Sequence, residues 1–294
     1  MSDLPTVVFM TLRRWFFDSE GRPKSFRLRD KRNTQDDPFD EYLAKHVLAG
    51  LHRIACVRAS GPLVTPDMVL YRPERCVRGR IHELADDIDR IVALEVKKLE
   101  RTSQGSVARR SGLDYNTTPP CGRVRVHDVA GKVVDIRGFY LFVCVERISE
   151  NASDIVVTAL CMVDGNALNE DFGLYLSTTG QREKRIGLGS YGDGADRTRP
   201  MLIFANPLGV PEFDQSPILI HPSAVLEQST ADLRLAYRLR RSASGGGVRT
   251  FYCYRYRTDL PDGWTVTDLL DPFPTPAREA RTRPRGKFRL PFRV

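Results

Sequence analysis

The chain has 294 residues, a net charge of +8 and a pI of about 9.3. Its composition, 41% hydrophobic and 28% charged, is typical of a soluble globular protein. No apolar stretch approaches the roughly 18 residues that a membrane helix needs, so we expect a cytoplasmic protein. The excess of positive charge favours a polyanionic partner such as nucleic acid.

Two residue types narrow the possibilities further. Only eight of the 45 basic residues are lysines, so the others are arginines, which suit bidentate phosphate contacts but are also favoured by GC-rich codons. The six cysteines are scattered without CxxC spacing, which argues against a zinc site or a disulfide framework.

The first strong helical pattern follows a polar stretch, residues 19–38. Asp37 is a typical N-cap and Pro38 a typical first-turn residue, and the pattern predicts a helix from 38 to about 54. Its apolar positions recur at helical spacing: Phe39, Leu43, Val47, Leu51 and Ile54.

Two β runs come next, VTPDMVLYR (64–72) and RIVALEVKK (90–98), separated by a charged stretch. Strand alternation in the second run puts Ala93, Glu95 and Lys97 on one face. The opposite face is apolar and suited to a core. A Glu and a Lys on a strand fit for burial need a charged partner or a metal ion.

The remaining segments predict mainly strands. Residues 98–122 are polar and irregular, 123–128 and 132–137 form a hairpin, and 138–148 form a buried strand. Periodicity leaves 154–165 open as a partner strand or a short helix. Further strands are predicted at MLIFANPLG (201–209) and VRTFYCYRYRT (248–258), whose Tyr and Arg residues either stack bases or divide between core and surface.

Asp67 and Glu95 are the candidate metal ligands. If their strands pair, the two carboxylates can hold a hard cation such as Mg²⁺ between them. The metal would stabilise charge on a phosphate and lower the pKa of a bound water, and Lys97 would orient or deprotonate that water. Asp87 or Asp89 is a rival ligand, but only five residues separate Asp89 from Glu95, too few for a strand, a turn and a return strand.

The pair Pro66-Asp67 followed by Glu95-Val96-Lys97 resembles the motif of the PD-(D/E)XK nucleases. This resemblance implies an α/β fold with a mixed sheet: an αβββαβ core at about 38–165 and a DNA-recognition elaboration at 166–271. The sequence shows no internal repeats and no clear linker, so we expect a single domain at 1–271, followed by a Pro- and Arg-rich, poorly packed basic tail at 272–294. It implies a Mg²⁺-dependent type II restriction endonuclease that cuts double-stranded DNA at a short specific site. The products would be a 5′-phosphate and a 3′-hydroxyl. A homodimer and a companion DNA methyltransferase are the implied partners.

Several other residues are candidate helpers. Glu41 either supplies a further ligand or complements the helix dipole, and Lys98 either contacts phosphate or lies on the surface. Asn116, Thr117 and Thr118 either touch the substrate or form a local turn. A glycine-rich basic loop is a candidate DNA contact, through Arg182, Lys184, Arg185, Arg197 and Arg199.

Other functions remain open at this stage. A repair or recombination nuclease on the same core would cut branched or damaged DNA, and a non-catalytic protein would only bind it. A nucleotide-cofactor enzyme is disfavoured, because the GxGxxG match at Gly187 is followed by no predicted helix.

Overall fold

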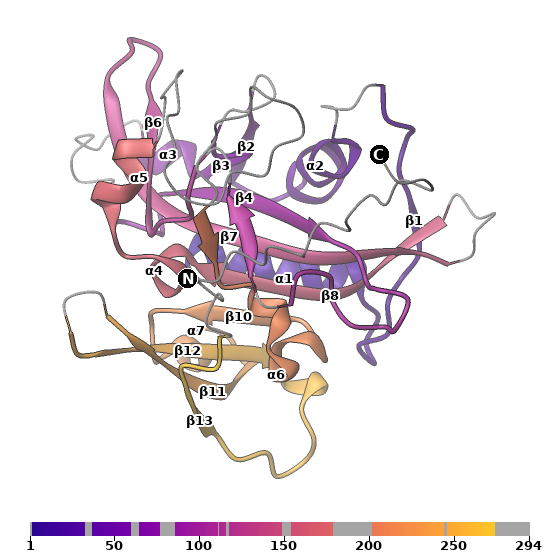
Figure 1. Cartoon of the computed structure of the whole chain (residues 1–294). Helices are drawn as coiled ribbons and strands as arrows, with labels where there is room; N and C mark the ends of the chain where they lie inside the picture. Colours follow the sequence, from indigo (N-terminus) through magenta and orange to yellow (C-terminus); the bar gives the residue numbers. More distant parts are fainter. Residues whose placement is uncertain are drawn as a thin grey trace, which may run out of the picture.

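The computed structural model describes residues 2–32, 37–59, 65–76, 86–110, 112–115, 118–148, 154–178, 202–243 and 246–273. These residues form a mixed α/β structure built on one large mixed sheet of 11 strands with a few short helices (Figure 1). The mixed-sheet α/β class expected from the sequence is therefore confirmed. No helix of the described part is long and apolar enough to cross a membrane.

The main path of the sheet runs β13-β11-β12-β10-β8-β7-β4-β3-β2. In chain order the strands of this path are β2 (Ala55–Arg58), β3 (Met68–Tyr71), β4 (Ile91–Leu99), β7 (Val133–Arg147), β8 (Asp154–Asp164), β10 (Ile218–His221), β11 (Leu233–Ser242), β12 (Val248–Tyr256) and β13 (Thr267–Leu270). Two strands lie off it: β1 (Phe26–Arg27) pairs with β8, and β6 (Arg123–His127) pairs with β7.

Helix α1 (Leu4–Phe16) covers one face of the sheet, where it contacts β4 and β8 (Figure 1). The Asp3 carboxylate caps it by accepting from the Thr6 amide at 2.9 Å. Every fourth residue of the helix is fully buried against the sheet, namely Leu4, Val8, Leu12 and Phe16. The apolar side of β4, Val92, Leu94 and Val96, belongs to this same core, as strand alternation predicts.

The helix predicted at 38–54 is shorter than expected. It consists of α2 (Pro38–Tyr42) and a π-helical continuation, Leu43–Leu48. Asp37 caps it by accepting from the Phe39 amide at 3.0 Å. Ile54 is buried although it lies beyond the helix, because the chain turns back after Gly50 and enters β2.

The strands after α2 follow part of the expected αβββαβ order. β2, β3 and β4 form an antiparallel series, and β7 then pairs with β4 in parallel. A parallel pair needs a long crossover, which in the expected core contains a helix. Here the described residues between Leu99 and Val133 contain no helix; they contain β5 (Leu113–Tyr115) and β6 instead.

Other segments test the remaining predictions. The hairpin β6–β7 is confirmed, with Arg123 opposite Arg137, and residues 154–164 form a strand antiparallel to β7 rather than a helix. At 201–209 the described strand is only β9 (Leu202–Phe204), which pairs with β5 in a separate two-stranded sheet. Residue Phe273, expected in a poorly packed tail, is buried, and 274–294 lie outside the described residues.

The other helices of the described residues are short segments between strands. These are α3 (Pro73–Cys76), α4 (Gly165–Leu168), α5 (Phe172–Thr178), the 3-10 turns Pro207–Gly209 and Arg257–Asp259, α6 (Pro211–Asp214) and α7 (Leu226–Ser229). In β12 the rings of Tyr254 and Tyr256 are buried in the core, so the described structure does not offer these two tyrosines to nucleic-acid bases.

Candidate active site

The antiparallel pairing of β3 with β4 brings Asp67 against Glu95. Met68 lies opposite Leu94, so Asp67, one residue earlier, reaches the level of Glu95. The two residues are joined reciprocally: the Val96 amide donates to Asp67 Oδ2 at 2.7 Å, and the Asp67 amide donates to Glu95 Oε2 at 3.2 Å. The two acids singled out in the sequence are thus side by side.

Lys97 lies on the same face of β4 as Glu95. Its Nζ donates to Glu95 Oε1 at 2.7 Å, and the two side chains are 28% and 12% exposed. Burial acts to lower the pKa of Lys97, but the nearby carboxylates, Glu95 first, hold it above its ordinary value. Lys97 is therefore a cation in a partly buried acidic cluster.

The negative charge of this cluster affects the pKa of Asp67. Burial raises the pKa of the Asp67 carboxyl well above its ordinary range, and the negative charge of Glu95 adds to the increase. The hydrogen bond from Val96 and the charge of Lys97 oppose the shift only in part. Two carboxylates this close, with one ammonium bound to Glu95, favour the addition of a further positive charge.

Asp40 of α2 is a third acid of this site, and the sequence analysis did not single it out. Its Oδ1 is buried and has no hydrogen-bond partner among the described residues. Burial, together with the charges of Asp67 and Asp37, raises its pKa to about 8. The sequence held a signal for it, because the residue four positions after Asp40 is the apolar Ala44, whereas the residue four positions after Glu41 is Lys45.

Glu41, the acid chosen from the sequence, faces the other way. Its carboxylate binds Arg29, and it accepts from Lys45 Nζ at 2.6 Å and lies 3.7 Å from Arg58. The hydrogen bonds from Lys45 and Arg29 lower its pKa to about 2. These ion pairs engage Glu41 with basic residues, whereas the charge of Asp67 acts on Asp40.

The remaining predicted helpers are only partly brought to the site. Lys98 points to the opposite side of β4 from Lys97 and forms an ion pair with Asp37, the cap of α2. Thr118 Oγ1 lies 3.5 Å from Thr65 Oγ1, two residues before Asp67. Outside the described residues lie Asn116, Thr117, Arg182, Lys184, Arg185, Arg197 and Arg199.

Close backbone packing holds the segment that leads into Thr118 and β6. A Cβ at Gly165 would lie 2.2 Å from the Cys121 carbonyl oxygen, and one at Gly138 would lie 2.8 Å from the same atom. The Cys121 amide also donates to Tyr140 Oη at 2.8 Å. Tyr140 is the partner of Glu95 in the β4–β7 register, so this segment crosses the sheet beside the acidic cluster.

The rival ligands Asp87 and Asp89 lie in the turn before β4. Asp87 pairs with Arg90 at 2.8 Å, and Asp89 lies 3.6 Å from Arg75. The strand register places this turn beside Tyr71, at the far end of β3 from Asp67. The geometry therefore favours Asp67 as the partner of Glu95.

The donor set at the site fits a hard divalent cation. Asp67 and Glu95 offer carboxylate oxygens, which Mg²⁺ prefers, and Asp40, whose Oδ1 is buried without a hydrogen-bond partner among the described residues, adds negative charge nearby. Within the described residues, no group of three or more His, Cys, Asp or Glu side chains is already arranged around one metal position. Mg²⁺ is usually held by one or two carboxylates, with waters and substrate phosphate completing its shell, so two ligands suffice.

Comparisons with known proteins give no relative. No protein-family model, curated protein or solved structure matches this chain.

Proposed function

We propose that this protein is a Mg²⁺-dependent endonuclease that hydrolyses phosphodiester bonds in double-stranded DNA, and that it acts as a type II restriction enzyme. One observation carries the proposal: Asp67, Glu95 and Lys97 form a hydrogen-bonded cluster on two paired strands. The order of α2, β2, β3, β4 and the parallel β7 supports it, because the PD-(D/E)XK motif occupies the corresponding strands of its own core.

Each side chain has a distinct task in this mechanism. Asp67 and Glu95 would hold the cation, and Asp40 would add a third carboxylate beside it. A bound Mg²⁺ supplies charge stabilisation at the phosphate and a water of lowered pKa. The Lys97 ammonium donates hydrogen bonds that orient the attacking water and offset the negative charge developing on the phosphate oxygens.

The restriction role extends the proposal to partners. A palindromic site presents two equivalent strands, which suits two equivalent centres in a homodimer. A methyltransferase that modifies the same site would protect the host DNA. The products would carry a 5′-phosphate and a 3′-hydroxyl.

The first test is cleavage of unmethylated phage and plasmid DNA by the purified protein, with Mg²⁺ or with EDTA. Wild type is expected to give discrete fragments only with Mg²⁺. Asp67→Asn should give none, while the matched control Asp87→Asn, an acid of the turn before β4, should cut normally. Cutting by Asp67→Asn and loss of cutting in Asp87→Asn would refute this assignment of the site.

Other results would redirect the function. Cleavage of junctions or lesions only, with plasmid DNA intact, would indicate a repair or recombination nuclease. Salt-sensitive binding without cleavage under any divalent metal would indicate a non-catalytic DNA-binding protein.

A further inference from the structure

The β6–β7 hairpin projects from the same sheet that carries the acidic cluster. In the β4–β7 register Tyr140 lies opposite Glu95 and Gly138 opposite Ala93. Going back along β7, residues 133–137 no longer pair with β4 and pair with β6 instead. Figure 1 shows this hairpin extending beyond α5 and away from strands β10–β13.

The base of the hairpin is packed firmly against the rest of the molecule. Val124 and Ile136 are buried in a small core with Tyr175 of α5. The Arg125 amide donates to Tyr175 Oη at 2.9 Å, so α5 covers the free edge of β6. The hairpin therefore keeps a fixed direction relative to the sheet.

The arginines of the hairpin are all engaged in ion pairs. Arg123 donates to Asp86 at 2.8 Å, and Arg125 donates to Asp135 at 2.8 Å. Arg137 binds the fully buried Asp164. These pairs fix the structure of the hairpin and leave little positive charge along its length.

The tip has a different chemistry. We define the tip as residues 127–133. The Asp128 carboxylate accepts from the amides of Ala130 and Lys132 at 2.9 and 2.8 Å, which closes a tight turn. Val129 is fully exposed and Val133 is 43% exposed.

The two basic residues of the tip, His127 and Lys132, are exposed. Neither side chain has a hydrogen bond or ion pair to any described residue, in contrast to the three arginines behind them. Lys132 is also one of only eight lysines in the chain. The tip thus presents unpaired donors and small apolar groups on a rigid two-stranded support.

We propose that the β6–β7 hairpin tip enters the major groove of the duplex DNA that the Asp67–Glu95 centre cuts, and that it reads sequence there. This inference rests on the proposed function and names the element that selects the site. The major groove admits a two-stranded β-ribbon. Lys132 and His127 would donate to base acceptors or phosphates, and Val129 and Val133 would contact thymine methyl groups.

The strand length sets the reach of this contact. Val133 precedes Tyr140 by seven positions, which corresponds to about 23 Å at about 3.3 Å per residue. In the proposed arrangement the hairpin lies along the duplex, so at about 3.4 Å per base pair the tip would lie up to roughly seven base pairs from the scissile phosphate. Contact at this distance predicts a need for duplex well beyond the cut.

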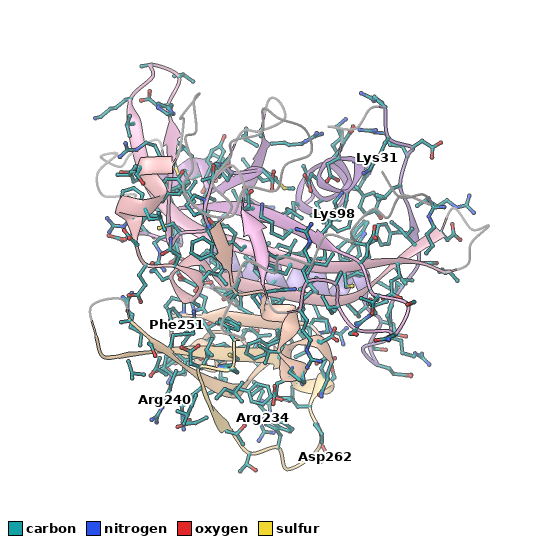
Figure 2. The ribbon with its side chains drawn as sticks, viewed as in Figure 1. Lys31, Lys98, Arg234, Arg240, Phe251 and Asp262 are labelled. Carbon is teal, nitrogen blue, oxygen red and sulfur yellow. The ribbon has the colours of Figure 1, made fainter. Side chains whose placement is uncertain are left out.

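The primary test measures binding of a 40-base-pair duplex in EDTA as a function of KCl concentration, by fluorescence anisotropy. Lys132→Ala should weaken binding several-fold and lower the slope of log affinity against log salt by about 0.9, the value for one lost phosphate contact. The control is Arg240→Ala, an exposed arginine of β11 near the lower end of the molecule in Figure 2, whereas the hairpin lies at the top of Figure 1; this variant should change neither quantity. Equal slopes and affinities for wild type, Lys132→Ala and the control would overturn the proposal.

A second measurement tests the predicted distance. Once the cleavage site is mapped, duplexes with about 4 or 12 base pairs beyond the cut are compared, bracketing the roughly seven-base-pair reach. Wild type should cut the long duplex markedly faster, and a His127→Ala, Lys132→Ala double variant should cut both equally. Wild type cutting both duplexes at one rate would overturn the inference while leaving the nuclease intact. Absence of all cutting would instead count against the proposed function, and the binding measurement would still decide on the hairpin.

Discussion

Asp40 and Glu41 are adjacent in α2, yet their carboxylates lie in opposite environments. Burial raises the pKa of Asp40, and the negative charges of Asp67 and Asp37 add to the increase. Glu41 is held by Arg29 and Lys45 on the other side of the helix. One residue turns the helix by about 100°, which suffices to place two adjacent carboxylates in different electrostatic environments.

This separation predicts different effects of two matched substitutions. Asp40→Asn should raise the Mg²⁺ concentration needed for half-maximal cleavage by roughly 10- to 100-fold, as loss of a supporting metal-site group typically does. Glu41→Gln should leave that concentration unchanged. A Mg²⁺ titration of the initial cleavage rate checks both, and the reverse pattern would return the role to Glu41.

Lys97 should act on the rate of cutting rather than on DNA binding. Lys97→Met keeps most of the side-chain volume but removes the ammonium that donates to Glu95. We expect kcat to fall by roughly 10²- to 10⁴-fold, the usual range for a positioned proton-transfer or water-orienting group. Duplex affinity in EDTA should be nearly unchanged. A variant that cuts at the wild-type rate would remove Lys97 from the mechanism.

Glu41 should make folding stability depend on pH. Its pKa is about 2 in the folded protein, against an ordinary value of 4.5. The group binds a proton more readily when unfolded, so its contribution is fully present above about pH 4.5 and is lost as pH falls towards 2. Chemical denaturation of wild type and Glu41→Gln should show a difference in free energy of unfolding near pH 6 that disappears by about pH 2. A difference that is independent of pH would contradict the ion-pair account.

A side chain at Gly165 should lower the stability of the fold. A Cβ there would lie 2.2 Å from a backbone carbonyl oxygen, that of Cys121, which cannot move without displacing the segment leading to Thr118. Gly165→Ala should therefore cost about 1–3 kcal/mol in free energy of unfolding, the range for overpacking. The control is Gly50→Ala, because nothing lies within 4 Å of a Cβ at that position. Denaturant melts of the two variants decide; equal stabilities would show that the Cys121 segment yields.

The sequence predicted the local features of the site and missed those that depend on packing. Strand alternation correctly put Glu95 and Lys97 on one face, and the register of β3 with β4 brought Asp67 to them. The sequence reasoning gave no weight to the ion-pair partners of Glu41, although Lys45 lies four residues after it on the same helix face. The apolar spacing of this segment does not distinguish the π-helical continuation at Leu43–Leu48 from a regular α-helix.

Long-range pairing was the other feature beyond sequence reasoning. Helix α1 does have a local pattern, with Leu4, Val8 and Leu12 four residues apart after the Asp3 cap, but the part of the sheet that it covers is set by long-range packing. The parallel pairing of β10 with β8 joins residues more than fifty positions apart, and no local pattern specifies it. In the described β4–β7 connection, Gly138 and Gly165 admit the Cys121 segment close to their backbone, a contact between distant residues that no local pattern specifies.

β7 is continuous from the hairpin to the partner of Glu95, so it acts as a spacer of fixed length. Inserting two residues into each hairpin strand would keep every side chain on its face and lengthen the spacer by about 6.6 Å, close to two base pairs. Inserting one residue in each strand would exchange the two faces and disrupt the small core beneath. If the proposed endonuclease reads DNA with this hairpin, the distance between its reading and cutting positions would change only in steps of two residues.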